Sequence, residues 1–549
     1  MNHAEETQGR PALAYSLFLC AVTLLVYVAA VRFPFIRFDD MMYVVENPSA
    51  HHWSSALSSF FPAFISDPFQ PQAVVIPNFY RPIVGSWVVF NYKIFGVHAA
   101  LWRIEILALY CLCVWLCRRV AYALTGNEFA SFAAALLFAL HPLHVEGVAW
   151  LSGAFVELLL CSFFLGGFLS YLQWRKTGRS SWLMRCAALV MLALLSKETG
   201  AALPVLIVAH AWIFRNREET SRSVRLWPVA AAACVPVALY ALLRFLAIHG
   251  VVASKLRHNW GEALRSAPLF FSIYLKHAIW PFHLANWYGT QIVTGLTLRE
   301  FYLPLILCLA YLGFMLWALT RKPLVGFLLL WWVVPLSIAL VGVINFPEDE
   351  FIHDRFTFVA LAGFCILAGS LLDRLPAANQ KLFGFPVFSA AALAGLTAIL
   401  GVASALQVFT WRSDLTMAAH AVEVSPTAVR PRILLGVALH REHDKAAALA
   451  LYRDTINMAP DRWDAIFAYG TELANNGDRN AAFQVLSHGL EVAPKKSPFY
   501  LIMADMLANA GYYDKAVKLL ENGIPIAEQP DLLRSKLANI EARRRGAAH

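Results

Sequence analysis

Two adjacent carboxylates, Asp39 and Asp40, follow the first long apolar segment, at the point where a membrane helix would emerge into water. Charged groups at the edge of a membrane are costly unless they are paired or used. A carboxylate that is partly removed from water has a raised pKa and can take a proton from an attacking hydroxyl group. One of the two is therefore a candidate catalytic base. The alternative is an interfacial carboxylate pair that caps a juxtamembrane helix.

Four other polar clusters interrupt the apolar segments. They are Tyr80-Arg81-Pro82, the stretch from His141 to Glu146, Lys197-Glu198, and His353-Asp354-Arg355. Taken singly, each cluster has a structural explanation in membrane anchoring, helix capping or an ion pair between neighbouring helices. Four distant clusters that emerge on one side of a membrane would instead favour a shared site.

The composition is that of a membrane protein. The 549 residues are 59% hydrophobic and 15% charged, and the mean hydropathy is +0.55. A spanning helix needs about 20 apolar residues. About eleven segments approach this length, which predicts an all-α, polytopic helical bundle with spans near residues 12–31, 101–121, 129–141, 148–172, 183–196, 199–214, 226–247, 301–320, 324–344, 356–373 and 384–408. The first segment is too long for the core of a cleaved signal peptide and is expected to stay attached.

The distribution of basic residues predicts the orientation of these spans. With the N-terminus in the cytoplasm, the short loops on that side contain Arg118-Arg119, Arg175 to Arg179, Arg215 to Arg225, Arg321-Lys322 and Arg374 to Lys381. Short basic loops are typical of the cytoplasmic side. The opposite face then receives all the polar clusters, the aromatic loop 41–100 with its expected interfacial helices, a short helix over 265–280 and the segment from Glu348 to Arg355. An odd number of spans also places the C-terminal region outside.

The charge and the positions of the cysteines argue against nucleic-acid binding, a disulfide framework and a thiolate metal site. The formal charge of +9 comes from basic residues in short loops, which argues against nucleic-acid binding. All nine cysteines lie within apolar segments, so neither a disulfide framework nor a thiolate metal site is indicated.

A repeat of 34 residues begins where the apolar segments end. Pro426, Pro460 and Pro494 keep this spacing, and the pairs Gly436/Gly470 and Ala448/Ala482 share it. The pattern is typical of tetratricopeptide repeats, in which small residues let two helices pack closely. We therefore predict a membrane domain over 1–408 and an α-solenoid of about three repeats over 409–549. Such a stack usually binds a protein or peptide, and the alternative is a stalk or a dimerisation element.

The ordered motifs resemble a known family. They are Phe38-Asp39-Asp40-(x)2-Tyr43-(x)3-Asn47-Pro48, Tyr80-Arg81-Pro82, His141-Pro142-Leu143-His144-Val145-Glu146, Ser196-Lys197-Glu198 and Asp354-Arg355-Phe356-Thr357-Phe358. This set resembles bacterial membrane proteins that join a GT-C glycosyltransferase core to tetratricopeptide repeats, and the related transmembrane and tetratricopeptide-repeat O-mannosyltransferases.

The resemblance implies an inverting transfer of a mannose-like hexose from a polyprenyl-phosphate donor to a hydroxyl acceptor, such as a protein Ser or Thr, on the outer face. It implies that Asp39 is the base and Asp40 its neighbour. The leaving phosphate needs cations or oriented donors. Lys197, Arg81 and Arg355 are the candidate cations, and His141 and His144 are candidate donors. Supporting roles fall to Glu146, Glu198, Asp354 and His353, of which the two glutamates orient the cations.

The sequence departs from the family pattern at one place. Relatives tend to carry charged residues after the Ser that corresponds to Ser152, where this chain reads Gly153-Ala154-Phe155-Val156-Glu157. A missing cation there would mean another donor or weaker activity. No metal or other cofactor is expected, because a monophosphate leaving group does not require one. The family also suggests a bacterial inner membrane, with the repeats in the periplasm.

Three other functions fit parts of the sequence. The acceptor could be a glycan or lipid of the envelope, in which case the repeats serve assembly. The chain could be a non-catalytic membrane scaffold whose repeats recruit envelope proteins. A transporter is disfavoured because the ionisable groups gather at one face rather than at the membrane midplane.

Overall fold

The computed structural model describes residues 3–37, 39–60, 79–215, 226–248, 258–342, 351–376, 381–382 and 385–547. The chain forms two compact units, Met1–Thr416 and Met417–His549. Parts of the segments named above lie outside the described ranges: Phe38, residues 61–78 of the aromatic loop, residues 216–225 of the basic loop, and Glu348.

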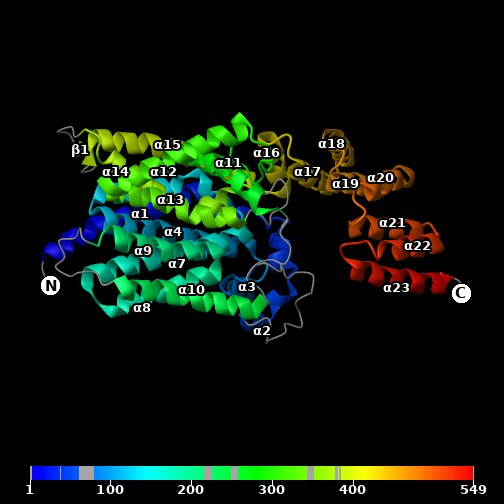
Figure 1. Cartoon of the computed structure of the whole chain (residues 1–549), viewed down its shortest axis with the longest axis horizontal. Coiled ribbons are helices and arrows are strands. Elements are labelled where there is room, and N and C mark those ends of the chain that lie inside the picture. Colours follow the sequence, from blue (N-terminus) through cyan, green and yellow to red (C-terminus); the bar gives the residue numbers. More distant parts are fainter. Residues whose placement is uncertain are drawn as a thin grey trace. The chain divides into compact units, whose positions relative to one another are not determined.

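The first unit is a bundle of helices that lie side by side (Figure 1). Each of the eleven predicted apolar segments forms a helix: α1 (His3–Tyr27), α4 (Ala99–Thr125), α5 (Glu128–Leu140), α7 (Leu151–Thr177), α8 (Ser180–Ser196), α9 (Ala202–Ile213), α10 (Leu226–Ile248), α12 (Leu303–Arg321), α13 (Pro323–Gly342), α14 (Ala360–Leu372) and α15 (Val387–Thr410). Among the described residues, seven helices are long and apolar enough to cross a membrane. A bent helix pair and three shorter apolar helices account for the other four segments. The predicted all-α, multi-pass membrane architecture is confirmed.

The core of the bundle is formed around α7, most of which is buried inside the protein. Phe168 of α7 packs against Trp331 of α13, with ring centroids 4.7 Å apart. Small residues let other helices approach closely: a side chain on Gly369 of α14 would lie 2.5 Å from the Ala130 carbonyl oxygen of α5. Close packing at small residues is the usual means of helix association in membranes.

The segments at one end of the bundle are short and irregular. After α1 come a 3-10 turn η1 (Val28–Arg32), an extended stretch, a π-turn η2 (Met41–Val45), a 3-10 turn η3 (Pro48–His51) and the helices α2 (Trp53–Ser58) and α3 (Pro82–Phe95). The same end contains the turns η4 (Pro142–His144), η5 (Glu198–Ala201), η6 (Leu298–Tyr302) and η8 (Asp354–Thr357), and the helices α6 (Glu146–Ala149) and α11 (Trp260–Ile279). Pro142 explains the break between α5 and α6, which are bent by 53°.

The opposite end of the bundle contains the only pairing of strands among the described residues, between β1 (Lys381–Leu382) and β2 (Phe385–Pro386). Phe385 packs against Phe129 of α5, with ring centroids 5.1 Å apart. This short pairing comes just before α15, and the fold class remains all-α.

The second unit is a stack of helices: α17 (Val429–Arg441), α18 (Lys445–Met458), α19 (Trp463–Asn475), α20 (Arg479–Val492), α21 (Ser497–Asn509), α22 (Tyr513–Gly523) and α23 (Pro530–Ala547). They follow α16 (Asp414–Val424), in which the boundary between the two units falls. Residue 408, the predicted end of the membrane domain, lies in the last turn of α15, because Val408 and Phe409 continue that helix.

The period of 34 residues is explained by the packing within each helix pair. A side chain on Gly436 would lie 2.3 Å from the Tyr452 ring, and one on Gly470 would lie 2.6 Å from Leu486. Each glycine lets the second helix of its pair approach the first. Ala504 and Leu520, both fully buried, take the same two positions in the third pair. The unit therefore has tetratricopeptide-like packing.

Candidate functional site

Asp39 and Asp40 lie in different environments. Asp39 is half-buried in a turn, and its backbone carbonyl accepts a hydrogen bond from the Tyr43 amide. Asp40 is fully buried. Its Oδ2 accepts from the Ile36 amide at 2.9 Å, and its Oδ1 accepts from both the amide and the hydroxyl of Ser152. Both oxygens of Asp40 are thus occupied by donors that fix the chain around Asp39.

Buried groups around Asp40 stabilise this arrangement. Burial raises the pKa of the Asp40 carboxyl, and the hydrogen bonds from Ser152 and Ile36 and the charge of Arg103 oppose the rise. Arg103 is buried within α4 and donates to the backbone carbonyls of Phe33, Pro34 and Ala149. It joins the extended stretch after α1 to the end of α6. Arg103 and Ser152 are therefore positioning residues for the acidic segment.

The two predicted histidines are bound to the backbone. The His141 Nε2 lies 3.1 Å from the Ala278 carbonyl, and its Nδ1 accepts from the Leu143 amide. The His144 Nδ1 lies 2.7 Å from the Phe138 carbonyl, and its Nε2 lies 3.2 Å from the Phe358 carbonyl. Both rings are at least 97% buried. This geometry favours a role in holding the turns after α5 and before α14, rather than contact with a substrate.

Glu146 brings the second and fourth predicted clusters together, those of His141 to Glu146 and of His353 to Arg355. It accepts from the Arg355 amide at 2.9 Å and from the Arg355 guanidinium. His353 adds a contact, with its Nδ1 3.4 Å from the Glu146 Oε1. The guanidinium also lies 4.7 Å above the Trp150 ring. This contact is the one expected of a carboxylate that orients a cation, and the role of the pair in a reaction stays a prediction.

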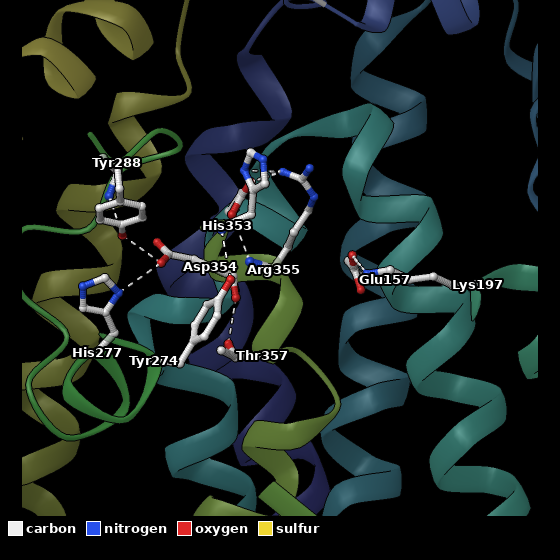
Figure 2. Close-up of polar contacts among 11 residues, drawn as sticks. Glu157, Lys197, Tyr274, His277, Tyr288, His353, Asp354, Arg355 and Thr357 are labelled. Carbon is white, nitrogen blue, oxygen red and sulfur yellow. Dashed lines mark hydrogen bonds and ion pairs between the residues drawn. The ribbon is translucent and has the colours of Figure 1, made fainter. Parts of the chain in front are cut away.

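Asp354 points away from Arg355, toward another part of the chain. Figure 2 shows Tyr288 and His277 directed at its carboxylate. The Tyr288 hydroxyl donates to the Asp354 Oδ1 at 2.8 Å, and the His277 Nδ1 lies 3.6 Å from the same oxygen. Burial raises the pKa of Asp354, whereas the contacts with His277 and Tyr288 lower it. The turn that carries Arg355 is thereby fixed on both sides.

Lys197 is paired inside the bundle. Its Nζ lies 2.5 Å from the Glu157 Oε1 of α7, and both side chains are buried (Figure 2). Burial lowers the pKa of Lys197, the Glu157 carboxylate opposes this, and the charges of Arg81 and Arg355 add to it. Glu157 belongs to the segment that departs from the family pattern. It places a carboxylate, not a cation, beside Lys197.

Arg81 completes the set of predicted cations. Its guanidinium forms two hydrogen bonds with the Glu198 Oε2, at 2.7 and 3.1 Å. Burial lowers the pKa of Arg81, but the Glu198 and Glu157 carboxylates outweigh this and raise it. Glu198 thus orients a cation, as Glu146 does.

The charges of these clusters act on one another. Burial and the Asp39 carboxylate raise the pKa of the Tyr43 hydroxyl to about 12, and the charges of Arg81 and Arg355 oppose the rise. Together with burial, the charges of the same two arginines lower the pKa of Lys197. Contacts show part of this arrangement directly: the Lys197 and Arg355 cations each lie 5.3 Å from the centroid of the Phe356 ring, and Arg355 lies over Trp150, two residues before the Ser152 that donates to Asp40.

Three further residues belong to the site, and sequence reasoning did not select them. They are Arg103, Ser152 and Glu157. A charge within an apolar segment is expensive in a membrane, and this signal could have identified Arg103 and Glu157. Ser152 carries no comparable signal, because serine is common in membrane helices.

Among the residues that the structure describes, no group of three or more His, Cys, Asp or Glu side chains is arranged to hold a metal ion. The expectation of a metal-free reaction stays a prediction.

The chain is similar in sequence to several known proteins. No protein-family model matches the chain. It is 32% identical over 192 residues to a protein O-mannosyl-transferase, Tmtc2, of Drosophila melanogaster, covering 34% of this chain and 20% of the relative. A protein O-mannosyl-transferase of Caenorhabditis elegans is 24% identical over 454 residues, covering 77% of this chain and 59% of the relative. The chain thus spans less than two thirds of the length of these relatives.

Solved structures are more distant. ArnT from Cupriavidus metallidurans, in a crystal structure with undecaprenyl phosphate, has a TM-score of 0.40 and 17% identity, with 90% of this chain and 80% of that chain covered. The oligosaccharyltransferase of Archaeoglobus fulgidus has a TM-score of 0.38 and 11% identity, with 72% and 56% covered.

The sequence similarity to the fly and nematode proteins confirms the resemblance that the motifs predicted, while a bacterial origin stays a prediction. The chain is a multi-pass membrane protein related to the TMTC protein O-mannosyl-transferases.

Proposed function

We propose that the chain is a glycosyltransferase that moves a mannose-type hexose from a polyprenyl-phosphate donor to a hydroxyl group of a protein. The names of its relatives support the class of reaction and acceptor. The observation that carries the proposal is the convergence of oriented cations on the acidic segment. Arg355 lies 4.7 Å over the Trp150 ring, two residues before the Ser152 that donates to Asp40, and the Lys197 and Arg355 cations each lie 5.3 Å from the centroid of the Phe356 ring. The half-buried Asp39 carboxylate is therefore on a segment next to cations that could neutralise a phosphate.

The reaction needs one proton acceptor and one anion-binding group. The acceptor oxygen attacks the anomeric carbon, its proton passes to the Asp39 carboxylate, and the bond from the anomeric carbon to the phosphate oxygen breaks. The electrons of that bond go to the phosphate, which leaves with an additional negative charge. Attack from the face opposite the leaving group inverts the anomeric configuration. General-base catalysis of this kind typically contributes a factor of about 10² to 10⁴.

Asp39 is better suited to the role of base than Asp40. Its side chain is half-buried, whereas both oxygens of Asp40 are hydrogen-bonded inside the protein. An incoming hydroxyl group would have to displace these donors to reach Asp40, whereas Asp39 is partly exposed. We therefore assign proton abstraction to Asp39 and positioning to Asp40, Arg103 and Ser152.

The cations serve the leaving group. Arg355, Lys197 and Arg81 are each oriented by a carboxylate, so they need little reorganisation when a phosphate arrives. His353 and Asp354 fix the turn that carries Arg355, and His141 and His144 fix the adjacent turns. We place this end of the bundle on the outer face of the cell membrane, because the basic loops lie at the other end. The repeat unit selects the protein acceptor.

Mass spectrometry of envelope proteins and glycolipids tests this proposal in cells with and without the gene. The gene-deletion strain is complemented with the natural chain, with Asp39→Asn or with Glu46→Gln, which alters an exposed carboxylate of the same segment. We expect a hexose on specific proteins with the natural chain and with Glu46→Gln, and none with Asp39→Asn. Loss of a hexose from a glycolipid would assign another acceptor. Full modification with Asp39→Asn would contradict the catalytic role.

A further inference from the structure

Glu198 faces a second arginine that the proposed mechanism has not used. Arg244 lies near the end of α10, and its guanidinium is 3.5 Å from the Glu198 Oε1. Arg81 occupies the other carboxylate oxygen at 2.7 Å. Tyr80 and Tyr240 also meet, with ring centroids 5.9 Å apart, which joins the start of α3 to α10. Two arginines from distant segments are thus placed on one carboxylate.

This cluster differs in composition from the other ion pairs at the same end of the bundle. Lys197 pairs with Glu157, and Arg355 pairs with Glu146. Glu198 instead contacts two guanidinium groups, those of Arg81 and Arg244. Two guanidinium groups held close together form a favourable place for an added anion.

The cluster is also the most accessible of the three. The side chains of Arg81 and Glu198 are 24% and 30% exposed, whereas those of Lys197 and Glu157 are 8% and 3% exposed. An incoming anion can therefore reach Arg81 without opening the core of the bundle. Arg81 remains within electrostatic reach of Tyr43 and Lys197, and so of the groups around Asp39.

The position of Arg244 indicates which anion would bind. α10 contains one of the candidate membrane spans, Leu226–Ala247. Leu239, Leu242 and Phe245 of this helix are exposed apolar side chains, as expected of a surface that faces lipid, and they lie on faces of the helix other than the one that carries Arg244. An anion held by Arg244 would lie at the edge of the membrane. A phosphate attached to a long apolar chain fits both the charge and the neighbouring surface.

We propose that Arg244 and Arg81 together bind the phosphate group of the polyprenyl-phosphate substrate, while Glu198 keeps the two guanidinium groups apart and oriented. The inference rests on the proposed function and adds a residue to it. Arginine suits this role because its planar fork can form two hydrogen bonds with one phosphate. Arg355 and Lys197 then meet the phosphate oxygen nearest to the reacting carbon.

Binding of undecaprenyl phosphate to the purified full chain in detergent, followed by native mass spectrometry, tests the inference. The variants are Arg244→Ala, Arg244→Lys and Arg299→Ala, which removes an exposed arginine of η6 as a matched control. We expect Arg244→Ala to weaken binding roughly ten- to a hundredfold, the usual range for a lost charge-assisted hydrogen bond. Arg244→Lys should weaken it less, and Arg299→Ala should leave it unchanged.

Other measurements separate the possible outcomes. Unaltered binding by Arg244→Ala and Arg244→Lys, with binding by the natural chain, would overturn the inference and leave the proposed function intact. No binding by the natural chain would contradict the proposed donor as well. Displacement of the lipid by millimolar inorganic phosphate would assign a free-phosphate site and overturn the lipid assignment.

A kinetic readout distinguishes binding from a purely structural role. In a transfer assay, Arg244→Lys should raise the KM for the lipid donor with little change in kcat. Its thermal unfolding midpoint should match that of Arg299→Ala. A fall in kcat at unchanged KM would contradict a role in donor binding.

Discussion

The two ends of the helix bundle use charged residues differently. At one end, Arg118 pairs with Glu128 at 2.7 Å across a short connection, and Glu128 is 47% exposed. At the other end, Arg355 pairs with Glu146, which is 209 residues away in the sequence and only 3% exposed. The first pair closes a loop between neighbouring helices. The second joins distant segments at the expense of desolvating a carboxylate, which is the pattern expected where a site requires a fixed cation.

The contrast between the two ends predicts that substitution of Glu146 causes the largest loss of stability and of transfer. Glu146→Ala would leave the partly buried Arg355 guanidinium without its carboxylate and would release the turn of η8. Removal of one partner from a buried pair typically destabilises a protein by about 3–5 kcal/mol. We therefore expect a large fall in the unfolding midpoint, measured by thermal scanning in detergent, and loss of transfer. A midpoint equal to that of the natural chain would show that the pair does not hold this end of the bundle.

Variants of the Lys197–Glu157 pair can separate an effect on stability from an effect on transfer. Lys197→Met alone should be destabilising, by about 3–5 kcal/mol, because Glu157 stays buried without a cation. The double variant Lys197→Met/Glu157→Met should recover much of that loss, because well-packed apolar residues often replace a buried pair without penalty. Transfer should remain lost in both. A double variant with full transfer would remove Lys197 from the mechanism.

A smaller effect is expected at Ser152. Ser152→Ala keeps the backbone amide that donates to Asp40 and removes only the hydroxyl. Loss of one hydrogen bond to a buried charged group costs about 1.5–3 kcal/mol. We expect a moderate fall in stability and in kcat, with an unaltered KM for the donor, measured by transfer kinetics. Ser152→Thr keeps the hydroxyl and should restore most of the rate if this bond is responsible.

The smallest effect is expected at the opposite end of the bundle. Glu128→Gln removes a charge that is half exposed to solvent and paired with Arg118. Exposed ion pairs contribute about 0–1 kcal/mol. Thermal scanning and transfer assays should therefore give values close to those of the natural chain. A loss as large as that of Glu146→Ala would mean that the two ends do not differ in the way described here.

The helices could be predicted because hydropathy acts locally. Each of the eleven apolar segments became a helix, and the 34-residue period marked the repeats, since Gly436 and Gly470 are small for a local packing reason. The partners of the charged residues could not be predicted in the same way. Glu146 meets Arg355 only because distant turns converge, and no spacing in the sequence records that approach.

The polar motifs indicated where the site lies better than they indicated the role of each residue. His141 and His144 stand in the most recognisable motif, yet their ring nitrogens contact backbone carbonyls and the Leu143 amide. An imidazole that fixes a turn and one that binds a phosphate look the same in a sequence. The distinction between Asp39 and Asp40 likewise depends on which carboxylate the Ser152 donors reach.

The most direct test of the account is the rate of hexose transfer from a mannosyl-phosphoryl-polyprenol donor by the purified full chain, compared with the rate of Asp39→Asn. Undecaprenyl-phosphate binding is measured on the same samples, to show that the donor site is intact. We predict that Asp39→Asn lowers kcat by about 10² to 10⁴ while lipid binding is retained. Transfer by Asp39→Asn at the rate of the natural chain would contradict the central claim that Asp39 is the base.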